Sequence, residues 1–316
     1  MSHPFRFALS RSSFDPRRWK DDVRRIESLG YSTVFFPDHF GEQWDPTAAL
    51  AAAGAVTEKL RVGTLVFDVD YRHPVVYAKQ AATLQILTGG RFEFGIGAGW
   101  MESDYLEAGL PYDRPAVGVE RLGEALEIIR SMWARERTSF EGRHYTVREV
   151  ARAAAGLDPA APPRILVGGG GRRVLELAGR HADIVGINPK MEAGRILPET
   201  PADLRPERTL EKVRWVREAA ERAGRDPEAI ELNALAFVVK VTDDPSGLRS
   251  ALARSTGMSE EEVADCPIFL TGSAQEIRER LEKRREQTGI SYVTLAATAH
   301  EAVEAFAEVV EPLVGR

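Results

Sequence analysis

Short apolar runs with the character of buried β-strands alternate along this chain with stretches of helical spacing, and this alternation constrains the fold most. Eight strand candidates occur, at residues 5–9, 33–36, 61–66, 92–96, 165–167, 183–187, 231–239 and 292–295. Helical segments follow most of them; in one, Leu122, Leu126, Ile129 and Trp133 recur at the spacing of a single helix face. Alternating strands and helices predict a parallel sheet with right-handed crossovers.

Eight such units within 316 residues suit a (β/α)8 barrel better than two doubly wound domains. No linker rich in proline, glycine and serine divides the chain, so we expect a single α/β domain over residues 1–316. We interpret four irregular stretches as insertions at the C-terminal face of the strands: 98–115, 140–163, 188–206 and 240–267. The proline-containing stretch 188–206 is the predicted lid.

Composition excludes several classes of protein. The formal net charge is −6, which argues against nucleic-acid binding because phosphates require a basic face. Cys266 is the one cysteine, so no disulfide framework or cysteine-rich zinc site is expected, and the six histidines never pair at metal-ligand spacing. The chain starts without a secretory signal and has no apolar run of about 20 residues, so we expect a cytoplasmic protein that does not bind membranes.

In a (β/α)8 barrel, the functional site lies at the C-terminal ends of the strands. The second strand candidate leads directly into Asp38 and His39. Histidine exchanges protons near neutral pH, so His39 is a candidate acid or base at the barrel mouth. A loop histidine bonded to a backbone carbonyl is the other interpretation, and position alone does not decide between them.

Two glycine runs follow later strands. Gly95, Gly97 and Gly99 alternate at the end of the fourth strand, where a flat ligand could approach the backbone or the barrel could simply turn tightly. They do not match the dinucleotide fingerprint, because Trp100 stands where its last glycine belongs. The run 168–171 precedes two arginines and a helix, an arrangement that suits an anion or a flexible turn.

Taken together, these strand ends resemble the bacterial luciferase-like flavin and deazaflavin oxidoreductases, within the branch that depends on coenzyme F420. The matching pieces are PDHF at 37–40, VGT at 62–64, RHPVVYAKQAATLQILTGGRFEFGIGAGW at 72–100 and VGGGGRRVLELAGRHAD at 167–183. The resemblance extends from the first strand to the last helix, and the run 72–100 is its most specific part.

The resemblance implies a barrel that holds its cofactor at the C-terminal mouth, with His39 as the catalytic residue over the reactive ring. It also implies a cis peptide bond between Leu65 and Val66, which would bulge against the other face of that ring. The cofactor contacts that it implies include Gly170 and Gly171 for the phosphate. The other predicted cofactor-binding residues are Asp38, Leu65, Val66, Gly97, Ala98, Gly99, Ser103 and Arg172.

Trp100 marks a departure from one branch of this family. The sugar-phosphate dehydrogenases carry a glutamate acid at its position, so we expect Trp100 to line an apolar substrate pocket instead. The sequence thus predicts an oxidoreductase that transfers a hydride between F420 and a small organic substrate, working as a homodimer. The alternatives are an FMN-dependent monooxygenase of the same barrel and a non-catalytic barrel that only binds flavin.

Overall fold

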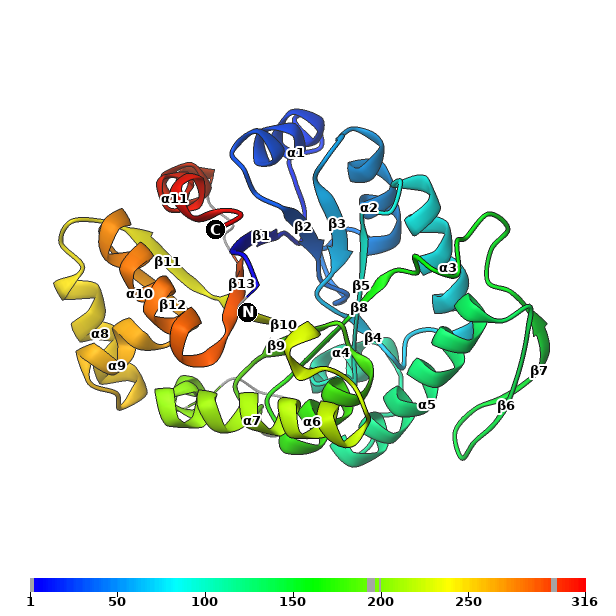
Figure 1. The fold of residues 1–316 in the computed structure, drawn as a ribbon. Helices are drawn as coiled ribbons and strands as arrows, with labels where there is room; N and C mark the ends of the chain where they lie inside the picture. Colours follow the sequence, from blue (N-terminus) through cyan, green and yellow to red (C-terminus); the bar gives the residue numbers. More distant parts are fainter. Residues whose placement is uncertain (1–2, 192–196, 199, 297–299) are drawn as a thin grey trace.

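A closed barrel of parallel strands forms the centre of the molecule, surrounded by helices (Figure 1). The computed structural model describes residues 3–191, 197–198, 200–296 and 300–316. The barrel strands are β1 (Arg6–Ser10), β2 (Thr33–Phe36), β3 (Arg61–Thr64), β4 (Phe67–Asp68), β5 (Phe92–Gly97), β8 (Arg164–Gly169), β9 (Ile184–Ile187), β10 (Glu231–Ala236) and β13 (Ile290–Leu295). Their order is β3-β2-β1-β13-β10-β9-β8-β5-β4, and an additional pairing of β3 with β5 closes the ring. The predicted (β/α)8 barrel is confirmed.

The outer layer consists of helices that follow the strands in sequence. They are α1 (Trp19–Ser28), α2 (Pro46–Ala55), α3 (Pro74–Leu87), α5 (Pro115–Ala134), α6 (Arg172–His181), α7 (Pro206–Arg222), α10 (Ala274–Thr288) and α11 (His300–Leu313). Asp45 caps α2 by accepting a hydrogen bond from the Ala48 amide at 2.8 Å, with Pro46 at the first helical position. No helix in the described part of the chain is long and apolar enough to cross a membrane.

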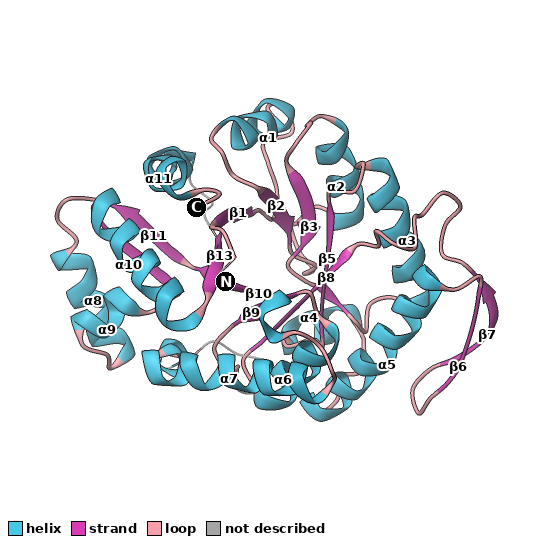
Figure 2. Cartoon of the chain, viewed as in Figure 1, coloured by secondary structure: helices cyan, strands magenta, loops and turns pink. Residues whose placement is uncertain are grey.

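Two strand candidates differ from their predicted extents. The stretch 61–66 ends as a strand at Thr64, and the Leu65–Val66 peptide bond is cis, as the family resemblance implied. The stretch 231–239 leaves the barrel after Ala236. Its continuation, β11 (Val238–Val241), pairs with β12 (Phe269–Gly272) in a separate two-stranded sheet at the left of Figure 2. Apolar continuity alone could not reveal that change of sheet.

The four irregular stretches take different forms. Helix α4 (Glu102–Ala108) lies within 98–115, and α8 (Ser246–Thr256) and α9 (Glu260–Asp265) lie within 240–267. The stretch 140–163 overlaps a hairpin of β6 (Arg137–Glu141) and β7 (Thr146–Ala151), which projects from the barrel in Figure 2. Of the predicted lid 188–206, residues 192–196 and 199 lie outside the described residues, and the remainder includes the 3-10 helix η1 (Thr200–Leu204). A second 3-10 helix, η2 (Pro227–Ala229), precedes β10.

A buried ion cluster fills the barrel at the N-terminal ends of its strands. Glu93 is fully buried and accepts hydrogen bonds from Arg6 at 2.5 Å, Arg61 at 2.8 Å and the Tyr292 hydroxyl at 2.8 Å. Above it lies an inner apolar cluster of Ala8, Phe35, Leu166, Ile184 and Tyr292, against which Leu65 and Val66 pack. The cis segment therefore forms the floor of the opposite, C-terminal mouth.

Candidate active site at the barrel mouth

His39 and Asp104 form a hydrogen-bonded pair at the mouth. His39 follows β2, and Asp104 lies on α4 with 4% of its surface exposed. His39 Nδ1 lies 2.6 Å from Asp104 Oδ2, and the Tyr71 hydroxyl donates to the same oxygen at 3.3 Å. A carboxylate oxygen accepts, so Nδ1 carries the proton and Nε2 is left as the atom that exchanges protons. The ring nitrogen of His39 therefore binds a carboxylate and not a backbone carbonyl, which favours the acid–base interpretation over the loop-histidine interpretation.

Asp38 is buried beside this pair and bound to Arg72. Its Oδ2 lies 2.9 Å from Arg72 Nη1, and Arg72 also reaches Asp45 at 3.2 Å. Burial raises the pKa of Asp38, and the Arg72 guanidinium offsets only part of that rise. The ion pair with Arg72 therefore holds the Asp38 carboxyl on the loop that carries His39, and its contact with a cofactor stays a prediction.

Close packing explains the glycines at the end of β5. A Cβ on Gly95 would lie 1.9 Å from the Thr64 carbonyl oxygen, and a Cβ on Gly97 would lie 2.8 Å from a methyl group of Val66. Gly99 has a φ of +74°, a conformation that L side chains rarely adopt. These glycines let β5 pack directly against the cis segment, so the tight-corner interpretation holds for Gly95 and Gly97. Contact with a flat ligand remains a prediction.

A second acidic network supports the Gly99 turn. The Tyr105 hydroxyl lies 2.8 Å from Asp68 Oδ2 and 2.9 Å from Asp70 Oδ2, and Arg121 binds Asp70 at 2.7 Å. Burial raises the pKa of Asp68 to about 7. A Cβ on Gly99 would lie 2.0 Å from the Tyr105 hydroxyl oxygen, so this network packs directly against the turn.

The glycine run after β8 is partly packed and partly open. A Cβ on Gly170 would lie 2.2 Å from the Pro189 carbonyl, whereas a Cβ on Gly171 would meet nothing within 4 Å. Gly171 is the N-cap of α6, and no side chain caps that helix. The guanidinium of Arg172 pairs with Glu176 at 3.0 Å. The uncapped backbone amides of this helix end can bind an anion, and the Nη groups of Arg172 can add to them; both contacts stay predictions.

The remaining predicted residues divide between the mouth and the surface. The Trp100 ring packs edge-on against His39, with centroids 5.8 Å apart, so these two predicted residues do come together. Ala98 is half-buried, and its carbonyl oxygen would lie 2.4 Å from a Cβ on Gly118 of α5. Ser103 is exposed on α4, and its neighbour Asp104 is the residue that turns inward.

Sequence reasoning missed Asp104, Tyr71, Asp68 and Tyr105. Each is an ordinary acidic or aromatic residue in a loop, a two-residue strand or a short helix, and its role depends on which way α4 faces. An acid and a tyrosine in adjacent positions, Asp104 and Tyr105, were the available signal. The pattern could not show that both point toward the mouth.

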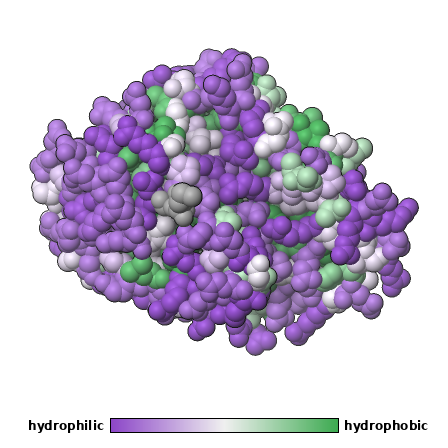
Figure 3. Space-filling model, viewed as in Figure 1, coloured by the Kyte–Doolittle hydropathy of each residue, from purple (hydrophilic) through white to green (hydrophobic). Residues whose placement is uncertain are grey.

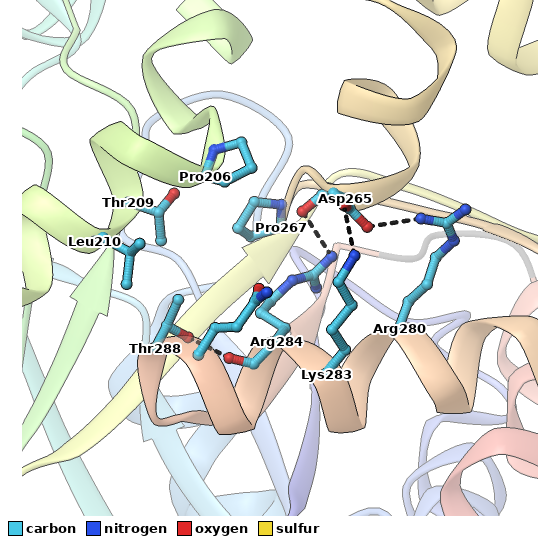
Figure 4. Close-up of a pocket in the computed structure, with 10 residues that line it drawn as sticks. Pro206, Thr209, Leu210, Asp265, Pro267, Arg280, Lys283, Arg284 and Thr288 are labelled. Carbon is cyan, nitrogen blue, oxygen red and sulfur yellow. Dashed lines mark hydrogen bonds and ion pairs between the residues drawn. The ribbon is translucent and has the colours of Figure 1, made fainter.

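Two cavities lie away from these residues. One, of about 30 Å³, is lined by residues of α7 and α10, where Asp265 binds Arg280 at 2.6 Å and Lys283 at 3.2 Å (Figure 4). The other, of about 180 Å³, lies between α1 and α11. Neither is lined by a residue of the candidate site.

Comparison with known proteins identifies relatives along most of the chain. An F420-dependent glucose-6-phosphate dehydrogenase of Intrasporangium calvum is 34% identical over 236 residues, which cover 70% of each chain. A protein of the same name from Microbacterium testaceum is 33% identical over 213 residues, covering 63% of this chain and 62% of the relative.

Solved structures share the fold at low identity. An F420-dependent tetrahydromethanopterin reductase from Methanopyrus kandleri superposes with a TM-score of 0.77 at 17% identity, covering 99% of both chains. An F420-dependent secondary alcohol dehydrogenase, solved with an F420-acetone adduct, gives 0.77 at 18% identity, covering 98% of this chain and 99% of that one. The sequence model described as luciferase-like monooxygenase matches residues 1–314. The chain therefore belongs to the luciferase-like monooxygenase family.

Proposed function

We propose that this chain is an oxidoreductase that transfers a hydride between coenzyme F420 and a small organic substrate at the mouth of the barrel. The observation that carries this proposal is the likeness to F420-dependent dehydrogenases over more than two thirds of the chain. When bound, the deazaflavin supplies or accepts the hydride at its ring carbon. The chain itself supplies binding, orientation and proton exchange.

The residues present fit this cofactor. The N-terminus of α6 has no side-chain cap, and the space beside Gly171 is open, which suits a phosphate held by backbone amides. Leu65 and Val66 are half-buried on the floor of the mouth, which suits one face of a flat ring. Asp38, Gly97, Ala98 and Gly99 would contact the ring from the surrounding loops, and Gly170, Gly171 and the Arg172 amide would hold the phosphate. Ser103 is exposed on α4, so a contact there would be peripheral.

His39 is the catalytic residue in this proposal. Its Nε2 gives or takes the proton that accompanies the hydride, and a positioned imidazole typically contributes about 10²–10⁴-fold in rate. Asp104 is a positioning residue, because it touches His39 Nδ1 at 2.6 Å and fixes which nitrogen faces the substrate. Tyr71 supports Asp104 through its hydroxyl, and burial and nearby aspartates raise the pKa of Tyr71, which keeps that hydroxyl protonated.

The proposal includes a homodimer formed through α2 and α3. Apolar residues lie on all sides of these two helices rather than on one stripe, and helices of that kind are usually covered on every side. Leu87 is 67% exposed and Ile86 40% exposed on α3. Figure 3 shows green patches over this region at the upper right of a largely hydrophilic face.

Anaerobic turnover tests the proposed function. The protein is mixed with reduced F420 and a panel of carbonyl and conjugated compounds, and with oxidised F420 and a panel of alcohols, while the visible absorbance of oxidised F420 is followed. We expect a change in absorbance that depends on both substrate and protein. Oxygen consumption with reduced FMN and no reaction with F420 would favour the monooxygenase instead. Tight flavin binding with no turnover on any compound would favour the non-catalytic barrel.

A further inference from the structure

Aromatic side chains form a wall around the His39–Asp104 pair. The wall consists of Phe40, Tyr71, Tyr105, Tyr112 and Trp100. Neighbouring ring centroids are 4.7 Å apart for Phe40 and Tyr71, 5.8 Å for Tyr71 and Tyr105, and 5.0 Å for Tyr105 and Tyr112. The Tyr112 hydroxyl then donates to the Trp100 carbonyl at 3.1 Å, and the Trp100 ring meets His39. The contacts therefore make a continuous path from the loop after β2 back to His39.

Much of this wall is available to a ligand. Phe40 is 42% exposed, although it is a large apolar side chain next to the residue proposed as catalytic. Tyr71, Trp100 and Tyr112 are half-buried, and Tyr105 lies beneath them. Exposed aromatic faces beside a proton-exchanging group suit a flat, conjugated ligand, because rings stack in offset or edge-on arrangements.

The charges around the wall favour an uncharged ligand. Six carboxyl groups lie in the hydrogen-bond and ion-pair networks behind it, those of Asp38, Asp45, Asp68, Asp70, Asp104 and Asp113. The cations in these networks are Arg72 and Arg121, and each binds two aspartates. Even without Asp68, whose pKa burial raises to about 7, negative charge exceeds positive charge here, which opposes the approach of a phosphate dianion.

We infer that the substrate presented to His39 is an uncharged molecule with a flat, conjugated apolar part, and that it is not a phosphorylated sugar. This inference rests on the proposed function and narrows it. In the reducing direction the substrate gains a C–H bond from the hydride of reduced F420, and its C=C or C=O π bond breaks. Nε2 first takes up a proton from solvent and then gives it to the neighbouring atom, so the substrate is reduced by two electrons and the cofactor is oxidised by two.

Binding measurements test this inference without relying on turnover. Cinnamaldehyde and glucose 6-phosphate are titrated by calorimetry into the full protein, both with and without F420. We expect cinnamaldehyde to bind more tightly than glucose 6-phosphate in both series. Phe40→Ala and Trp100→Ala should each weaken cinnamaldehyde binding by about two- to tenfold, the loss expected from one aromatic contact.

Val314→Ala is the matched control, because Val314 is a partly exposed apolar residue that bridges to Phe5 at the other end of the barrel. It should leave both affinities unchanged. Tighter binding of glucose 6-phosphate, or unchanged cinnamaldehyde affinity in both folded aromatic variants, would overturn the inference. F420 is titrated into the same protein in parallel. Failure of the proposed function is a separate result, because it shows itself there as an absence of F420 binding.

Discussion

The contact between His39 and Asp104 gives the sharpest test of the proposed chemistry. Asp104→Asn replaces a charged acceptor with a neutral amide of the same shape. A hydrogen bond to a charged group contributes about 1.5–3 kcal/mol, so its loss corresponds to roughly a tenfold to 150-fold decrease in kcat. The distance of 2.6 Å between His39 Nδ1 and Asp104 Oδ2 makes this bond a short one. Cofactor affinity should change by less than about threefold, since Asp104 contacts His39 rather than the predicted cofactor residues.

The assay compares four proteins at saturating cofactor: the parent, Asp104→Asn, His39→Asn and the double variant. His39→Asn keeps an amide N–H near the Nδ1 position for Asp104 but removes Nε2, so kcat should fall by about 10²–10⁴-fold. Since Asp104 acts through His39, the double variant should be no slower than His39→Asn alone. Tyr71→Phe removes the weaker partner of Asp104, at 3.3 Å, and should lower kcat by less than about threefold.

Two results would refute this reasoning. If folded Asp104→Asn keeps the parent's kcat while His39→Asn loses activity, Asp104 does not position the imidazole. If His39→Asn weakens cofactor binding but leaves kcat at saturation close to the parent's, His39 only packs against the cofactor. Thermal unfolding of each variant separates both results from a general loss of structure.

Three further predictions concern other parts of the molecule. Gly171→Asp should place a carboxylate at the open N-terminus of α6 and weaken F420 binding by more than tenfold in a direct titration, whereas an unchanged affinity would leave a plain turn there. Glu93→Gln should cost about 3–5 kcal/mol of unfolding free energy in denaturant titrations, because it removes the buried carboxylate that pairs with both Arg6 and Arg61; Arg6 keeps its second partner, Glu231. Burial alone would raise the pKa of Glu93, but the charges of Arg6 and Arg61 lower that pKa below its ordinary value. The stability that ionised Glu93 contributes should therefore be complete above the unfolded pKa of about 4.3 and be lost as the pH falls through the folded pKa. The Glu93→Gln variant should not show this loss. Ile86→Glu on α3 should shift the protein from dimer to monomer in light scattering, and a parent that is already monomeric would contradict the proposed interface.

The fold was predictable because its signals are local. Eight apolar runs with intervening helical spacing favour a barrel over two doubly wound domains. Two of the runs extend too far: 61–66 ends as a strand at Thr64, and 231–239 passes from β10 into a second sheet. The ion cluster was not predictable. Glu93 is a charged residue within an otherwise apolar strand, which sequence can show. Its partner Arg6 lies 87 positions away, and only closure of the barrel brings the two side chains together.

The candidate site was predictable only in the residues that directly follow barrel strands. His39, the cis bond at Leu65–Val66 and the glycine runs occupy strand ends that sequence can locate. Asp104 and Tyr71 come together with His39 only because α4 and the loop after β4 both fold over the barrel mouth. No residue spacing in the sequence shows which way α4 faces.

Parallel titration of the cofactor-free protein with F420 and with FMN, followed by fluorescence, tests the central claim most directly. The account predicts saturable F420 binding at micromolar concentration or below, with FMN bound more weakly. Micromolar binding of FMN with no detectable binding of F420 would contradict it.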